Sequence, residues 1–227
     1  RYVSSAKKLS NADVGEVIKF GVDPTGPVGG SLLANLIQNP SLMERVNQGR
    51  EVGYIIIFVG LIGIAIAFWK LFTLYTMGVA VAKQAKSKTH DKSNPLGRVL
   101  AVGEEHMNKD IETLELRLAE AIMAERPAIE RGIPVVKIIS VVAPLAGLLG
   151  TVTGMIVTFQ QITLFGTGDP KIMAGGISQA LVTTVLGLVV AIPTTLLHSF
   201  ANSSARGIIN VLEEQSTGIV AEHSDSK

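Results

Sequence analysis

The sequence contains no cysteine and few charged residues, and each shortage excludes a class of protein. Because its 227 residues include no Cys, a disulfide framework and a thiolate metal site are excluded. Asp, Glu, Lys and Arg make up 17% of the chain, and the formal net charge is +1. That balance argues against a nucleic-acid binder with a basic surface. The mean hydropathy of +0.40 is high for a soluble protein.

The sequence also lacks a recognisable catalytic or metal-binding group. Its histidines are scattered, and none pairs with a second ligand at metal spacing: His90, His106, His198 and His223. Gly147, Gly150 and Gly154 lie in an apolar run without the Lys-Ser/Thr pair that ends a phosphate-binding loop. His198 fits a satisfied residue at a membrane edge better than a proton relay. We therefore expect no enzyme activity, no metal and no cofactor.

Two long segments lack Asp, Glu, Lys and Arg altogether: Ile138–Phe165 and Ile172–Phe200. Each exceeds the roughly 20 apolar residues that a helix needs to cross a bilayer. Gly166–Lys171 joins them and has the composition of a tight turn. The two segments are predicted to form a transmembrane helical hairpin.

A third span precedes this hairpin in the chain. Gly53–Trp69 is free of charge, and the apolar character resumes after Lys70 as far as Ala82. Tyr54 at one end, and Trp69 and Tyr75 at the other, suit the two interfacial belts of a bilayer. We expect the long side chain of Lys70 to extend to the lipid headgroups.

The connection Lys83–Lys137 is polar and carries its bases next to the predicted spans. The positive-inside rule places it in the cytoplasm, with the N-terminus and the hairpin turn outside and the tail from Ser203 inside. Apolar residues recur on one helical face, which predicts a helix packed against others beyond the membrane: Ile111, Leu114, Leu118, Ile122 and Ile129.

The two ends of the chain carry weaker patterns. Ser31–Gln38 is predicted as a short amphipathic helix, and Asn39-Pro40 starts another at Pro40–Gly49. Because the chain begins without Met or a signal-peptide pattern, we expect a processed or truncated N-terminus. The last six residues are expected to be disordered. The predicted division is 1–50 outside with an amphipathic helix, 51–82 first span, 83–137 cytoplasmic helices, 138–200 hairpin, and 201–227 cytoplasmic tail.

Small and polar residues follow one stripe on each helix of the hairpin. The first stripe is Gly147, Thr151, Gly154, Thr158 and Gln161, and the second is Gly176, Ala180, Thr184, Gly187, Ala191, Thr195 and His198. Gly150 and Gly154 have the spacing of closely packed membrane helices. Helix packing alone explains such stripes. Thr151 and Thr184 are predicted at similar depth, however, and interior hydroxyls also line hydrated paths.

Two motifs in the hairpin resemble a known family. Ala143–Ile156 (APLAGLLGTVTGMI) and Gly176–Pro193 (GISQALVTTVLGLVVAIP) are similar to segments of the MotA/TolQ/ExbB proton-channel family. The resemblance is strongest to ExbB and covers about Val52 to the tail. The N-terminal segment resembles the end of the longer extension found in TtpC-type ExbB proteins.

The resemblance implies an all-α membrane protein with three transmembrane helices, extended by long cytoplasmic helices and assembled as a pentameric ring. The ring would lie in a bacterial inner membrane, with its N-terminus periplasmic and its C-terminus cytoplasmic. It would surround an ExbD-like single-span partner that carries the proton-binding Asp. Proton flow would drive a TonB-like protein and so outer-membrane transport.

The residues expected along the ion pathway are Thr151, Thr158, Gln179, Thr183 and Thr184, of which Thr151 and Thr184 match the family's pore threonines. Gln179 stands where ExbB and TolQ usually carry Glu, and an amide cannot titrate. Helix packing is assigned to Gly147, Gly150, Gly154, Gly176 and Gly187. A TolQ-like role in envelope integrity and a non-conducting membrane scaffold remain as alternatives, whereas a flagellar stator would have a fourth span.

Overall fold

The computed structural model describes residues 3–13, 16–17, 42–87, 91–166 and 170–225, and every regular element within them is a helix. The chain divides into two units, Arg1–Arg45 and Val46–Lys227. The first holds α1 (Val3–Ser10), which the sequence did not predict, and the start of α3 (Leu42–Gln48). The helix predicted at Ser31–Gln38 lies outside the described residues.

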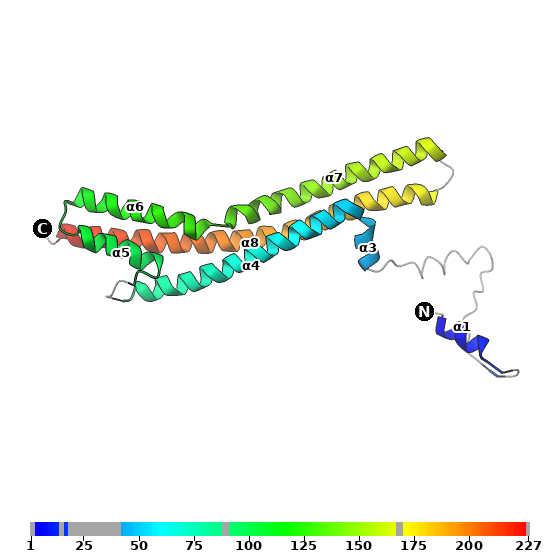
Figure 1. The fold of residues 1–227 in the computed structure, drawn as a ribbon, viewed down its shortest axis with the longest axis horizontal. Coiled ribbons are helices and arrows are strands. Elements are labelled where there is room, and N and C mark those ends of the chain that lie inside the picture. Colours follow the sequence, from blue (N-terminus) through cyan, green and yellow to red (C-terminus); the bar gives the residue numbers. More distant parts are fainter. Residues whose placement is uncertain (1–2, 14–15, 18–41, 88–90, 167–169, 226–227) are drawn as a thin grey trace. The chain divides into compact units, whose positions relative to one another are not determined.

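Three long helices dominate the second unit: α4 (Arg50–Gln84), α7 (Ile133–Phe165) and α8 (Pro170–Asp225). Each is long and apolar enough to cross a membrane, which confirms the three predicted spans. Figure 1 shows α4 and α7 lying along α8. At 56 residues, α8 is about 84 Å long. It therefore extends far beyond a bilayer core of about 30 Å.

The disorder predicted for the last six residues is wrong for the part that the structure describes. α8 passes residue 200 without a break and continues to Asp225. Its far end is held because His223, 6% exposed, lies with Nε2 3.2 Å from the carbonyl oxygen of Lys109. Tertiary contact thus orders a polar tail that has little helix signal of its own.

Small residues let α4 lie close to the other two spans. Gly53, Gly60, Gly63 and Ala67 are buried along one face. A Cβ added at Gly60 would lie 2.6 Å from Val190 Cγ2, and one at Gly63 would lie 2.9 Å from Ile139 Cγ2. The opposite face of α4 is exposed and strongly apolar, as a helix in contact with lipid requires: Tyr54, Ile55, Phe58, Leu61, Phe68, Trp69 and Phe72.

Lys70 does not extend to the surface as predicted. Its side chain is buried, 4% exposed, and Nζ donates a hydrogen bond of 3.2 Å to the carbonyl oxygen of Ala128 near the end of α6 (Ile111–Glu130). The last carbonyls of a helix lack partners within the helix and carry partial negative charge. α6 has no basic residue in its last turn. Lys70 therefore supplies, from α4, a hydrogen-bond donor and a second cation at this helix end, in addition to Arg131 at the C-cap.

The helices outside the spans pack on the C-terminal part of α8. α5 (Pro95–His106) and α6 share a hydrophobic core with α8 and with the end of α4. Leu114, Leu118 and Ile129 of the predicted α6 face are buried, while Ile111 and Ile122 are half-buried. From α8 the core receives Ala201, Ala205, Ile208, Ile209 and Leu212.

The turn from α4 into α5 is held by the side chain of Asn94, the N-cap of α5. Asn94 Oδ1 accepts a 2.8 Å bond from the Gly97 amide, and Nδ2 donates to the Asp91 carbonyl oxygen (2.9 Å) and to Gln84 Oε1 (3.3 Å). A Cβ at position 97 would collide with the Asp91 backbone. Glycine at 97 is therefore required for this close turn.

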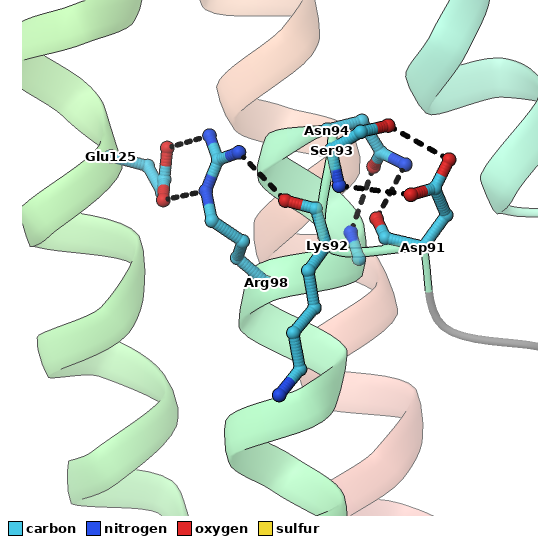
Figure 2. Close-up of polar contacts among 7 residues, drawn as sticks. Asp91, Lys92, Ser93, Asn94, Arg98 and Glu125 are labelled. Carbon is cyan, nitrogen blue, oxygen red and sulfur yellow. Dashed lines mark hydrogen bonds and ion pairs between the residues drawn. The ribbon is translucent and has the colours of Figure 1, made fainter.

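Figure 2 shows how the same turn is joined to α6. Arg98 forms a two-pronged ion pair with Glu125, at 2.6 Å from Nε and 2.7 Å from Nη2, and Nη1 donates to the Lys92 carbonyl oxygen. The hydrogen bond to Glu125 raises the pKa of Arg98. The carboxylate of Asp91 accepts bonds from the Ser93 amide and hydroxyl, which lower the pKa of Asp91.

Candidate functional site

The helices α7 and α8 meet along a seam of small residues with their backbones in contact. A Cβ added at Gly187 would lie 2.7 Å from the Ala143 carbonyl oxygen, and one at Gly154 would lie 2.8 Å from that of Gly176. Contacts this close are possible only without side chains. All five glycines assigned to packing are buried in this seam: Gly147, Gly150, Gly154, Gly176 and Gly187.

Thr158 and Thr183 fill this seam. They are 2% and 0% exposed, and a Cβ added at Gly176 or Gly150 would collide with their hydroxyl groups. Both hydroxyls donate to carbonyl oxygens of their own helix, Thr158 to Gly154 (3.0 Å) and Thr183 to Ala180 (2.9 Å). Such bonds satisfy the donor locally. The seam therefore contains polar groups, but these groups are buried and bonded within one chain.

Thr151 and Thr184 lie at the edge of the seam, where both are half-buried. Their hydroxyls also donate backwards, Thr151 to Leu148 O (2.6 Å) and Thr184 to Ala180 O (3.5 Å). A hydroxyl oxygen keeps acceptor capacity when it donates. These two threonines can therefore accept a hydrogen bond from water or from a partner on the exposed side.

The contacts of the seam place the two edge threonines at nearly the same depth. A Cβ at Gly147 would lie 3.2 Å from Thr184 Cα, and one at Gly150 would touch the side chain of Thr183. Thr151 follows Gly150 directly. With a rise of 1.5 Å per residue, Thr151 and Thr184 lie within about one helical turn of each other along the hairpin.

The stripe predicted on α8 differs from the buried face of the helix at two threonine positions, each by one residue. The sequence put Thr184 and Thr195 in the stripe, but the structure buries Thr183 and Thr194, both 0% exposed. Thr195 is exposed. Adjacent residues of a helix point about 100° apart, so a repeat of small residues does not distinguish the centre of a seam from its edge.

Gln179 and Gln161 are the other polar residues of the two predicted patterns. Gln179 is buried, 7% exposed. Gln161 is half-buried, and its Oε1 has no hydrogen-bond partner within the part of the chain that the structure describes. Sequence reasoning missed Ser178, whose hydroxyl donates a 2.8 Å bond to Gln48 Oε1 and ties the segment before α4 to α8. No motif signals this long-range contact.

The two apolar segments of the hairpin have no acidic or basic side chain of the Asp, Glu, Lys or Arg type with which to bind an ion. Residues 138–165 and 172–200 contain no Asp, Glu, Lys or Arg. Among the described residues there is no group of three or more His, Cys, Asp or Glu that could hold a metal. The hairpin can offer hydroxyl and amide groups to a charge that another molecule carries.

Comparison with known proteins gives the family. A sequence model of the MotA/TolQ/ExbB proton channel family matches residues 91–214, more than half of the chain. An ExbB homolog of biopolymer transport from Methanothermobacter thermautotrophicus is 26% identical over 189 residues, 76% of this chain and 67% of that relative.

Two further relatives carry related names. The biopolymer transport protein ExbB-like 1 of Synechocystis sp. is 29% identical over 175 residues, 69% of each chain. The biopolymer transport protein ExbB of Aquifex aeolicus is 48% identical over 58 residues, 26% of this chain and 39% of that relative. With the matched segment running from the turn before α5 through the whole hairpin, the chain belongs to the MotA/TolQ/ExbB proton channel family and is close to ExbB.

Proposed function

We propose that this chain is an inner-membrane proton-channel and motor subunit that works with an ExbD-like partner to energise TonB-dependent outer-membrane transport. The observation that carries this proposal is the pair of half-buried threonines, Thr151 and Thr184, within about one helical turn of each other on two apolar segments without Asp, Glu, Lys or Arg. A partner carboxylate in the membrane is costly when isolated. Hydroxyl groups and the water they hold reduce that cost when the carboxylate ionises.

The structure supports different roles for the five residues predicted along the pathway. Thr151 and Thr184 are half-buried, with one side accessible from outside the chain, and they line the pathway in this proposal. Thr158 and Thr183 are closed within one chain and act in packing. Gln179, also buried, has no titrating role, since an amide does not ionise.

The proposed assembly is a homopentameric ring with the hairpins facing the lumen. In such a ring, part of the exposed apolar surface of α7 and α8 contacts neighbouring copies and the rest contacts lipid. Both helices carry many exposed large apolar side chains. The partner's single span would lie in the lumen, where Thr151 and Thr184 of successive copies form a polar layer.

Proton flux in vesicles tests this function directly. The purified chain, reconstituted with an ExbD-like partner, should conduct protons, as measured with an enclosed pH-sensitive dye. The chain without the partner should conduct much less, because residues 138–165 and 172–200 contain no carboxylate. Native mass spectrometry from mild detergent should show the oligomer. A stable monomer, or a complex that never conducts, would favour a membrane scaffold.

The proposed orientation places the N-terminus in the periplasm and the α4–α5 turn in the cytoplasm. The basic residues that flank the spans on this side, among them Lys83, Lys86 and Lys137, motivate it. Because the chain has no native cysteine, Ser10→Cys and Lys92→Cys give clean single probes. An impermeant thiol reagent on intact spheroplasts should label position 10 only. Labelling of position 92 alone would reverse the orientation.

A further inference from the structure

A groove between α6 and α8, outside the spans, has no assigned role. It has a volume of about 190 Å³ and is lined by one face of each helix. Its floor is mostly apolar, with Ala119 and Ile122 from α6 and Val220 from α8. Glu115 and Glu213 also line it.

The two carboxylates lie at opposite ends of the groove. Arg126, four residues after Ile122, has Nη2 3.9 Å from Glu213 Oε1, which places Glu213 at the Ile122 end. A Cβ at Gly103 would lie within 3.3 Å of both Leu118 and Ile219, so the α6 residues before Leu118 lie near Val220. Glu115 is therefore at the Val220 end. Seven residues of α8 separate the ends, about 10 Å.

Neither carboxylate is neutralised strongly within the chain. Glu115 has no ion-pair partner among the residues that the structure describes. Within the described ranges Glu213 is paired only with Arg126, at 3.9 Å, and both side chains are about half exposed, 53% and 51%. An exposed pair at that distance contributes little. Both carboxylates are therefore available to cations from outside.

Ser216, which also lines the groove, is 5% exposed. Its Oγ is closed to solvent and has no hydrogen-bond partner within the described part of the chain. A partner in the groove would therefore cover this residue without bonding its hydroxyl.

We propose that this groove binds a basic amphipathic helix of a protein partner. Two cationic side chains two helical turns apart would pair with Glu115 and Glu213, and small apolar residues between them would cover the floor. The two carboxylates disfavour an anionic lipid surface or a nucleic acid at the same place. The proposal does not depend on ion conduction, so a non-conducting complex would leave it standing.

The test uses the full chain in nanodiscs of zwitterionic lipid and a fluorescent helical peptide with two lysines two turns apart, separated by alanine and leucine. Glu115→Gln with Glu213→Gln should weaken binding at least tenfold. Ala119→Trp fills the groove and should abolish binding. Glu105→Gln with Glu222→Gln is the matched control and should bind normally. Equal binding by all variants, or equal binding of a peptide with glutamates for lysines, would overturn the proposal.

A second measurement distinguishes a peptide partner from a second copy of this chain. Thr217 lines the groove and is exposed, so Thr217→Cys introduces a single thiol there. The peptide should protect this thiol from maleimide labelling. Cross-linking of Thr217→Cys between copies before any peptide is added would show that another subunit covers the groove, and the proposal would then be wrong.

Discussion

Replacing Thr151 and Thr184 together by valine should abolish energy-dependent transport while the complex still assembles. Valine keeps the volume and branching of threonine and removes only the hydroxyl. If these hydroxyls help to solvate a partner carboxylate, each missing hydrogen bond raises the free energy of the charged form by about 1–3 kcal/mol. That corresponds to roughly a ten- to hundredfold smaller population of the ionised carboxylate. The measurement is uptake in a strain lacking the native subunit.

The buried threonines of the same helices provide the matched control. Thr158→Val with Thr183→Val removes two hydroxyls that already bond their own helix inside the seam, and transport should remain close to normal. Thr151→Ser and Thr184→Ser keep the hydroxyl and should retain much of the activity. Gln179→Ala should reduce transport less than either valine change at the edge.

Co-purification of the partner must accompany each uptake measurement, because loss of the complex would imitate loss of conduction. Full uptake by the Thr151→Val, Thr184→Val protein would refute the pathway and leave packing as the role of both residues. The same conclusion would follow if the buried pair and the edge pair reduced transport equally.

The substitution Gly187→Ala should destabilise the hairpin. Its Cβ would lie 2.7 Å from the Ala143 carbonyl oxygen and 3.2 Å from Gly147 Cα. Both are backbone atoms, so the contact is relieved only if α7 and α8 move apart. Backbone shifts of this kind cost about 1–3 kcal/mol. Thermal unfolding in detergent or nanodiscs should show a clearly lower midpoint.

Two further glycine variants make this test specific. Gly207→Ala on the same helix meets nothing within 4 Å and should stabilise the protein by about 1 kcal/mol, the helix-propensity difference. Gly150→Ala collides with a side chain, that of Thr183, so Thr183→Gly should restore its stability in part. Thr183→Gly should not rescue Gly187→Ala. Equal midpoints for Gly187→Ala and Gly207→Ala would contradict the observed seam.

The three spans were predictable from the sequence because the requirement that identifies them is local. A helix that crosses the bilayer needs about 20 consecutive residues without charge, and a search along the chain finds such runs directly. The apolar face of α6 was predictable for a similar reason, since the helical spacing of its apolar residues indicates which face packs against a neighbouring helix. The family motifs at Ala143–Ile156 and Gly176–Pro193 were also visible in the sequence alone.

Only the tertiary structure decided which polar groups of those helices are buried and which are accessible from outside the chain. Thr183 and Thr184 have the same side chain at adjacent positions, yet one is fully buried and the other is half-buried. Lys70 looked like an interfacial lysine, but the end of α6, 58 residues away in sequence, supplies its acceptor at 3.2 Å. Burial and hydrogen bonding depend on which helix lies opposite, and that information is absent from the neighbouring residues in the chain.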